Sequence, residues 1–480
     1  MINYRLTKAY FYTLLTLLLA SSFCFGQVKM AAIFTDNMVL QQEAKVPIWG
    51  WSKSGKTISV KTSWNKQTKK TIADKNGKWK VYVATPKAGG PYELLISDGK
   101  NLTLKNILIG EVWILGGQSN MEMQLKGFKS QAIVGSNDAI FHSANPKLRL
   151  YVVPRSAKFE PQENSKTSFW KEADPETVSN FSAIGYFFGK ILQEQLKIPV
   201  GLINVNYGGS SAEAWMSRKD IEEFGGLTLP VIADSAKINN RTSTALYNGM
   251  LYPIIGYGIK GALFYQGESN YDRANQYETL FTNLAKEWRK EWNQGEFPFY
   301  YAQIAPYSYA KLSPDRIGEK LNSAYLRDAQ RKALAKIPNA GMVSLMDIGE
   351  EKSIHPSHKK EVGERFALMA LAKTYGLKGF GYTSPEYDTI EVSENIATIK
   401  FKNAGNGFTT FGKELINFEI AGADKIFVQA QAVISGSTIL VSSPLVKTPV
   451  AVRYAFKDFV IGELFSTEGF PVSSFRTDQF

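Results

Sequence analysis

The chain has very few of the side chains on which metal, thiol and redox chemistry depend. Its 480 residues include one cysteine, Cys24, and three histidines, His142, His355 and His358. One cysteine cannot form a disulfide within the chain, and it provides no cluster of thiolates for a metal. No His-Glu-x-x-His motif occurs, and His355-x-x-His358 is the only close pair of histidines. The sequence therefore predicts no metal site and no cofactor.

Acidic residues are fewer than basic residues, 44 against 56, which gives a formal net charge of +12. The lysines and arginines are scattered, apart from a local cluster at Lys66, Lys69 and Lys70. Because no basic stripe interleaved with aromatic residues and no zinc-finger or helix-turn-helix pattern is present, we expect no nucleic-acid partner. Charged residues make up 21% and hydrophobic residues 44% of the chain, a balance typical of folded domains. The length predicts two or three of them.

Long hydrophobic runs are also absent, except near the N-terminus. Two basic residues precede an apolar stretch over residues 10–20, which is shorter than the roughly 20 residues that span a bilayer. Small residues and a cleavage site near Gly26 follow, so residues 1–26 have the pattern of a secretory signal peptide. We expect export to a periplasm or the medium and no membrane span after cleavage, with an uncleaved anchor as the alternative. Cys24 follows Phe23 rather than a small residue, which argues against lipidation.

Three blocks of different periodicity follow the signal segment. Residues 27–106 contain short alternating runs and a hairpin signal at Asn76-Gly77, which predict a β-sandwich-like module. In residues 107–378, nearly continuous apolar runs alternate with helical stretches, as in a parallel α/β sheet. Residues 379–480 return to strand-like alternation and predict a second all-β module. The expected parallel strands are 107–116, 202–206, 261–265, 299–304 and 341–346, and the expected helices are 183–196, 277–292, 321–336 and 359–375.

A serine on a glycine-led turn stands directly after the first expected parallel strand. Residues 116–121 read Gly-Gly-Gln-Ser-Asn-Met, which places Ser119 at the carboxyl end of that strand, where ligand sites of such sheets lie. A turn of this kind exposes the hydroxyl and directs the serine N–H toward a substrate oxygen. Taken alone, the pattern is more typical of a serine at a helix N-cap.

Two further polar blocks follow expected parallel strands. Residues 206–215 contain Gly208 and Gly209, which let the backbone approach a ligand and direct an N–H into the site. Residues 265–270 read Tyr-Gln-Gly-Glu-Ser-Asn, and such polar side chains can donate a hydrogen bond to an oxyanion. Each block alone fits a plain turn equally well.

His355 is the base that we expect among the three histidines. It follows the last expected strand in a loop stiffened by Pro356, which places it on the same edge of the sheet as Ser119. A serine nucleophile needs a base that titrates near neutral pH, and histidine is the usual one. His142 lies in a polar loop and fits a surface residue, and His358 fits the first turn of a helix.

These blocks resemble the sialate O-acetylesterase family of the SGNH (GDSL-like) hydrolases. The similarity lies in Gly-Gln-Ser-Asn-Met-Glu at 117–122, Tyr-Gln-Gly-Glu-Ser-Asn at 265–270 and Ile-His-Pro at 354–356. It extends to Arg-Asp-Ala-Gln at 327–330 and to the flanking modules, so it spans most of the mature chain. The resemblance implies a three-layer α/β/α catalytic domain over 107–378, flanked by N- and C-terminal all-β modules.

The resemblance also implies hydrolysis of acetyl esters of sugars through an acetyl-serine intermediate. Ser119 would attack the ester carbonyl while His355 takes its proton and later activates water. The N–H groups of Ser119 and Gly209 would hold the oxyanion, together with a side-chain donor that we expect from Gln266 in preference to Asn270. Further oxyanion or substrate contacts are expected from Gln118, Asn270 and Glu268.

One position departs from the family pattern. Many relatives carry an aspartate two or three residues before the histidine, where it fixes the tautomer of the imidazole. Here those positions are Lys352 and Ser353. We therefore expect Asp347, Glu350 or Glu351, or a backbone carbonyl, to orient the histidine, which leaves a Ser-His dyad with weaker support.

The sugar that carries the acetyl group stays open at this point. Sialic acid with a 9-O-acetyl group is the family's name-giving substrate, and a basic chain suits an anionic sugar. Acetylated xylan or another plant glycan is the alternative, since related esterases of this fold act on them. A non-catalytic carbohydrate-binding protein has no use for four chemical blocks at strand ends, and a metal-dependent deacetylase needs more histidines. The oligomeric state is not predicted.

Overall fold

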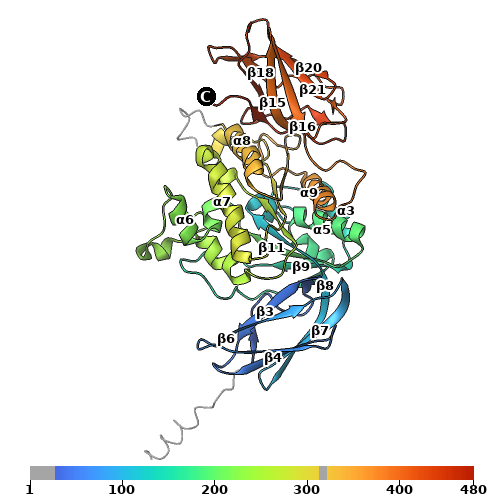
Figure 1. Ribbon diagram of the computed structural model, residues 1–480, viewed down its shortest axis with the longest axis vertical. Helices are drawn as coiled ribbons and strands as arrows, with labels where there is room; N and C mark the ends of the chain where they lie inside the picture. The colour runs from blue at the N-terminus through green and yellow to red at the C-terminus, as the bar shows by residue number, and fades with distance from the viewer. Residues whose placement is uncertain (1–26, 313–321) are drawn as a thin grey trace, which may run out of the picture.

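The computed structural model describes residues 27–312 and 322–480 of the chain. The expected signal segment, residues 1–26 with Cys24, lies outside the described residues. Three units follow one another along the long axis of the molecule, namely an N-terminal β module, a central α/β unit and a C-terminal β module (Figure 1). The fold class expected from the sequence is confirmed.

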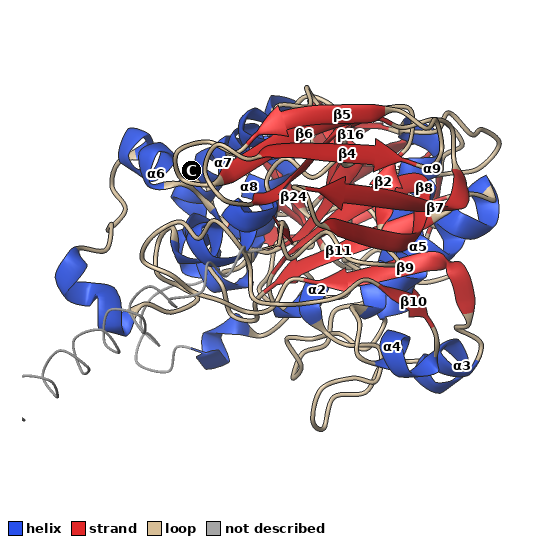
Figure 2. Cartoon of the chain, turned by 90° about the horizontal axis from the view of Figure 1, so that it is seen from below, coloured by secondary structure: helices blue, strands red, loops and turns tan. Residues whose placement is uncertain are grey.

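The N-terminal module is built from two small sheets that share one core. Its strands are β1 (Lys29–Met30), β2 (Val39–Gln41), β3 (Lys45–Trp51), β4 (Thr57–Thr62), β5 (Thr68–Ile72), β6 (Lys78–Ala84) and β7 (Gly89–Ser97). One sheet has the order β1-β3-β6, and in the other β4 pairs with β5 and β7 (Figure 2). The alternation of β6 buries Trp79, Val81 and Val83 and leaves the residues between them accessible. The sequence predicted a hairpin at Asn76-Gly77. In the structure this turn connects β5 in one sheet to β6 in the other, so the two strands do not form a hairpin.

A mostly parallel sheet forms the middle of the molecule. Its strands are β8 (Asn101–Gly117), β9 (Asn145–Val152), β10 (Lys171–Ala173), β11 (Val200–Asn206), β12 (Gly261–Tyr265), β13 (Phe299–Ala302) and β14 (Ala340–Val343). They lie in the order β10-β9-β11-β8-β12-β13-β14, and only β10 and β9 pair antiparallel. The expected apolar runs fall in β8, β11, β12, β13 and β14. The sequence reading missed β9, since Lys147 and Arg149 interrupt its apolar pattern, although Arg149 is buried and paired with Glu172.

β8 belongs to both the N-terminal module and the central sheet. Its first half pairs antiparallel with β7, and its second half pairs parallel with β11 and β12. The sequence predicted a boundary between residues 106 and 107, with a new strand that begins at Ile107. In the structure Asn106 takes a φ of +54°, and the pairing with β7 shifts register around Tyr92, so one strand continues through the irregularity.

Helices cover both faces of the central sheet. The larger ones are α5 (Ala183–Leu196), α7 (Ala274–Trp292), α8 (Ala324–Ala333) and α9 (Lys359–Lys373), and the smaller ones are α2 (Ser119–Glu122), α3 (Ser136–Phe141), α4 (Pro175–Ser179) and α6 (Arg218–Phe224). α5 packs beside α9, and α7 packs beside α8. From β8, Trp113 contacts Phe188 of α5, whereas Gly116 on the opposite face lies against Trp288 of α7. The sheet therefore lies between two layers of helices, which is the three-layer arrangement expected from the sequence.

The C-terminal module has its own core and rests on α8. Its strands are β15 (Glu386–Ser393), β16 (Ile396–Lys402), β17 (Phe408–Thr409), β18 (Phe418–Ala421), β19 (Phe427–Gln429), β20 (Gln431–Ser435), β21 (Thr438–Ser442), β22 (Ala451–Tyr454), β23 (Phe465–Ser466) and β24 (Phe475–Arg476). They form sheets in the orders β15-β16-β21-β20 and β19-β18-β22-β24 and the pair β17-β23. Arg327 of α8 donates a hydrogen bond to Ser474, and Asp328 pairs with Arg476. The block at 327–330 therefore ties the two units together.

Candidate active site

Ser119 lies at the carboxyl end of β8, as the first residue of the one-turn helix α2. The turn before it requires glycine, because Gly117 has a φ of +138° and a Cβ there would lie 2.1 Å from the carbonyl oxygen of Tyr265. The same carbonyl accepts a hydrogen bond from the N–H of Gln118 at 3.0 Å. The end of β8 and the end of β12 thus fix the position of the serine.

His355, which lies near the C-terminal end of the central unit in sequence, faces the hydroxyl of Ser119. Its Nε2 lies 2.7 Å from Oγ of the serine, and its Nδ1 lies 2.8 Å from Oε1 of Gln131. An amide oxygen only accepts hydrogen bonds, so Nδ1 carries the proton and Nε2 accepts from the serine hydroxyl. Phe128 packs edge-on against the imidazole at 5.4 Å between ring centroids. This is the geometry that a serine nucleophile and its base require.

The surroundings of His355 keep the imidazole neutral. Burial lowers its pKa, the positive charge of Lys359 lowers it further, and together they bring the pKa to about 4. A neutral imidazole has a free lone pair on Nε2 and acts as a base, whereas an imidazolium cannot. The other histidines play no part here, since His142 pairs with Asp138 on the surface and His358 pairs with Glu361.

None of the three carboxylates expected to orient the histidine is its partner at Nδ1, which bonds to Gln131. Asp347 instead forms a bidentate pair with Arg365, at 2.5 and 2.9 Å. Glu350 accepts hydrogen bonds from the N–H and the hydroxyl of Ser357, both at 2.7 Å. Glu351 is exposed to solvent. Asp347 and Glu350 are held by their own partners, so neither contacts Nδ1 of the imidazole in this structure.

The loop after β11 lies directly against the serine. A Cβ on Gly208 would be 3.4 Å from Cβ of Ser119, and the N–H of Gly208 donates to Oε2 of Glu122 at 2.8 Å. Glu122 is itself held by two hydrogen bonds of 2.6 Å from Arg155. Gly209 has a φ of +71°, and within the described ranges its N–H has no acceptor. This N–H is a free donor beside the nucleophile.

Gln266, the side-chain oxyanion donor expected from the sequence, already forms hydrogen bonds to other groups of the protein. Its amide nitrogen donates to the carbonyl of Ser210 at 3.1 Å and to Oδ1 of Asn270 at 2.7 Å, and its amide oxygen accepts from Tyr277. Asn270 donates in turn to Glu213 at 2.9 Å and is fully buried. Both amides therefore brace the loops after β11 and β12, because each faces a buried backbone or side-chain partner.

Gln118 and Asn120 flank Ser119 and connect it to the other blocks. Oε1 of Gln118 accepts hydrogen bonds from the backbone N–H groups of Gly267 and Ser269, at 3.2 and 3.3 Å. The amide nitrogen of Asn120 donates to Glu268 at 2.5 Å and to the carbonyl oxygen of Ile354 at 3.0 Å. The nucleophile turn, the third block and the histidine loop are joined through these two side chains.

A buried pair of opposite charges lies behind the dyad. Oδ1 of Asn120 accepts a hydrogen bond from Nζ of Lys359 at 2.5 Å, so the amide stands between Lys359 and Glu268. Burial raises the pKa of Glu268 to about 7 and lowers the pKa of Lys359 to about 7. The pair acts on His355 through the charge of Lys359, which disfavours the imidazolium.

The sequence reading missed five residues of the site, and three of them had a signal in the sequence. Asn120 and Glu122 stand inside the nucleophile block, and Lys359 stands four residues after the histidine at the start of a helix. Gln131 and Arg155 lie in loops without a motif, and only the fold brings them to the site. Within the described ranges, no group of three or more His, Cys, Asp and Glu side chains is arranged to hold a metal ion. No helix among the described residues is long and apolar enough to cross a membrane.

This chain is similar in sequence and in structure to known carbohydrate esterases. The model of the family described as carbohydrate esterase, sialic acid-specific acetylesterase matches residues 109–372. Sialate O-acetylesterase from Homo sapiens is 29% identical over 392 residues, which cover 76% of this chain and 74% of the relative. The crystal structure of a carbohydrate acetylesterase from Xanthomonas citri has a TM-score of 0.85 and 33% identity, and the match covers 94% of this chain and 100% of that chain. Ser119 and His355 both lie in the part that the family model matches.

Proposed function

Because this chain belongs to the carbohydrate esterase family of the sialic acid-specific acetylesterases, we propose that Ser119 and His355 are its catalytic dyad. The resemblance inferred from the sequence blocks is confirmed, and the chain is a carboxylic ester hydrolase whose relatives support activity on acetylated carbohydrates. The observation that carries the proposed dyad is the 2.7 Å contact between Nε2 of His355 and Oγ of Ser119.

In the proposed reaction, Oγ of Ser119 bonds to the ester carbonyl carbon while Nε2 of His355 takes the serine proton. The bond between that carbon and the sugar oxygen then breaks, and the sugar oxygen takes the proton from Nε2, which leaves an acetyl-serine. Water attacks the acetyl carbon and gives a proton to Nε2. Acetic acid leaves as the serine oxygen takes the proton from Nε2, and it then ionises to acetate in solution, so both residues return to their starting state.

The oxyanion of each tetrahedral intermediate would be held by the N–H groups of Ser119 and Gly209. The loop that carries the second donor is fixed by the chain of contacts from Arg155 through Glu122 to Gly208. One such donor typically contributes about 2.7–4 kcal/mol of transition-state stabilisation. Both donors are backbone groups of turns that are held by hydrogen bonds to neighbouring segments, so they need little rearrangement when the charge develops.

We propose an O-acetylated sialic acid, acetylated at the 9-hydroxyl, as the substrate. Two guanidinium groups support an anionic sugar near the serine, since Arg155 contacts the loop of Gly208 through Glu122 and Arg241 donates to the carbonyl of Gly209 at 3.1 Å. The side chain of Arg155 is 54% exposed, so the part of its guanidinium that is not bonded to Glu122 is accessible to a ligand. Acetylated xylan or another plant glycan is the second candidate, because the Xanthomonas relative is described only as a carbohydrate acetylesterase.

Acetate release separates the two substrates. O-acetylated sialoglycans and acetylated xylan are compared at equal acetyl concentration, with the Ser119→Ala variant as the control. We expect faster release from the sialoglycans and none above background from the variant. Faster release from xylan would transfer the assignment to plant glycans, and an active Ser119→Ala variant would refute the dyad. Labelling of folded protein by a fluorophosphonate tests the nucleophile separately, and failure to label at Ser119 counts against it.

We also propose that residues 1–26 are removed during export. The basic start, the apolar stretch over 10–20 and the small residues near Gly26 support a signal peptide. Expression of the full chain in a bacterial host, followed by N-terminal sequencing of the exported protein, tests this. A first residue at or near Gln27 is expected, whereas a protein that starts at Met1 in the cytoplasmic fraction contradicts the proposal.

A further inference from the structure

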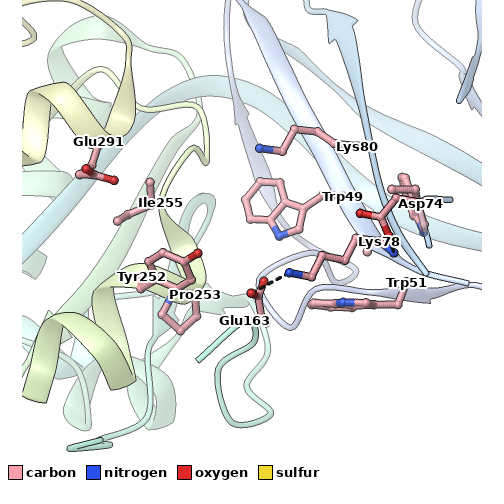
Figure 3. Close-up of a pocket in the computed structure, with 12 residues that line it drawn as sticks. Trp49, Trp51, Asp74, Lys78, Lys80, Glu163, Tyr252, Pro253, Ile255 and Glu291 are labelled. Atoms are coloured by element: carbon pink, nitrogen blue, oxygen red, sulfur yellow. Dashed lines mark hydrogen bonds and ion pairs between the residues drawn. The ribbon is translucent and has the colours of Figure 1, made fainter. Parts of the chain in front are cut away.

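A cavity away from Ser119, which we call the junction pocket, lies between the N-terminal module and the central unit (Figure 3). It has a volume of about 440 Å³. β3 and β6 of the N-terminal module provide one wall, with Trp49, Trp51 and Lys80, and the central unit provides the other, with Tyr252 and Glu291. Pockets of a few hundred Å³ at the junction of two domains are common places for small-molecule ligands.

The pairing of β3 with β6 explains why aromatic rings gather on this wall. Trp49 pairs with Lys80 and Trp51 pairs with Lys78, and side chains two residues apart point to the same side of a strand. Both tryptophans are half-buried, whereas the core of the module is formed by the alternate positions, such as Trp79. Trp49 and Trp51 pack against this core with part of their rings, and Trp49 is edge-on to Phe34. The rest of each indole lines the pocket and is open to a ligand.

Charged groups alternate with these rings and nearly cancel one another. Lys78 forms an ion pair of 2.7 Å with Glu163 across the junction, and Nζ of Lys80 lies 6.0 Å from the ring centroid of Trp49. The lining has two lysines and three carboxylates, those of Asp74, Glu163 and Glu291, so its net charge is close to −1. Such a lining does not select a strong anion, and it is too polar for a lipid.

We propose that the junction pocket binds a neutral saccharide chain. A sugar ring has C–H faces that pack on indole rings, and hydroxyl groups that donate to carboxylates and accept from ammonium groups. Trp49 and Trp51 would provide the stacking surfaces, and Lys80 and Glu291 would provide the hydrogen bonds. Among ligand classes, this combination of flat rings and balanced charge fits a polyhydroxylated neutral molecule best.

The junction pocket lies at the opposite edge of the central sheet from Ser119. α7 begins after the third sequence block, near the carboxyl ends of the strands, and runs back to Glu291 at the pocket. At 1.5 Å per residue, the 17 steps from Ala274 to Glu291 span about 25 Å. Binding at this pocket would therefore add to the proposed function, because the pocket would hold a part of the glycan that does not react.

Binding of unacetylated oligosaccharides tests this proposal without any ester chemistry. Xylohexaose and cellohexaose serve as neutral probes and trigalacturonic acid as the anionic probe, with isothermal titration calorimetry on the full mature protein. We expect a neutral probe to bind with a Kd below about 1 mM and the anionic probe to bind more weakly. We expect Trp51→Ala to raise the Kd of the neutral probe at least about tenfold, while the rate of hydrolysis of p-nitrophenyl acetate stays unchanged.

Two further variants make the result decisive. Tyr252→Ala removes a ring from the other wall, and it must weaken binding as well even if Trp51→Ala folds poorly. Trp64→Ala is the matched control, because Trp64 is a half-buried tryptophan of the same module outside the pocket. The proposal is overturned if no neutral probe binds, if the anionic probe binds more tightly, or if Trp51→Ala and Tyr252→Ala retain the affinity of the Trp64→Ala protein.

Discussion

Replacement of Gln131 by glutamate should move the acid limb of the pH–rate profile toward neutral pH. In the structure, Nδ1 of His355 donates to the uncharged amide of Gln131, and the pKa of the histidine is lowered to about 4. A carboxylate at the same place would stabilise the imidazolium. Two opposite charges about 4 Å apart interact by about 4 kcal/mol at an effective dielectric constant of 20, which corresponds to about three pKa units.

The observed shift should be smaller than this limit, because Gln131 is only half-buried and solvent screens part of the interaction. Opposite charges at this distance usually shift a pKa by about 1–3 units. The base must be unprotonated to act, so activity is lost as the pH falls through the pKa of His355. We therefore expect the acid limb, near pH 4 in the natural chain, to lie about 1–3 units higher in Gln131→Glu.

The assay is kcat/KM for p-nitrophenyl acetate between acid and neutral pH, since this parameter reports the ionisation of the free enzyme. Gln131→Leu is the companion variant, because it removes the acceptor without adding charge. A hydrogen bond to a charged group contributes about 1.5–3 kcal/mol, so we expect a loss of about tenfold to hundredfold in the leucine variant. An unchanged acid limb in Gln131→Glu would show that Gln131 does not contact the catalytic imidazole.

Three other substitutions, with His142→Ala as a control, test further parts of the site. His355→Ala should lower acetate release by several orders of magnitude while His142→Ala changes it little, and equal losses in the two variants would refute the assignment of the base. Glu122→Gln should weaken the anchor of Gly208 and lower kcat more than it changes KM, by about tenfold; an unchanged kcat would exclude that anchor. Lys359→Met removes a charge that lowers the pKa of His355, so the acid limb should move to higher pH, and a shift to lower pH would contradict this.

The fold and the contact between Ser119 and His355 could be predicted from the sequence because both depend on local patterns. Nearly continuous apolar runs marked β8, β11 and β12, and the polar residues after them marked the loops that meet at one sheet edge. Ser119 could be chosen because it stands at such an end, and His355 because it lies in the loop after the last strand and the number of histidines is small. Parallel strands bring their carboxyl ends together whatever their separation along the chain, so distance in sequence did not matter.

The partners of the dyad could not be predicted in the same way. Asp347 and Glu350 are close to His355 in sequence, yet Arg365 and Ser357 take their carboxylates. The partner that the structure shows, Gln131, is 224 positions away in an irregular loop. A side chain on a loop is placed by tertiary packing, and no periodicity records which direction it will point.

Asn120 explains why the sequence blocks work as a set. Its amide donates to Glu268 of the third block and to the carbonyl of Ile354 beside His355, and it accepts from Lys359 at the start of α9. Since Asn120 follows Ser119 directly, these bonds tie the nucleophile turn and the histidine loop to one buried side chain. A buried amide between two ionisable groups leaves little freedom to move, because each lost hydrogen bond costs about 1–3 kcal/mol. This buried network therefore helps to hold Oγ of Ser119 and Nε2 of His355 in contact, in a site where Nδ1 faces an amide and no carboxylate.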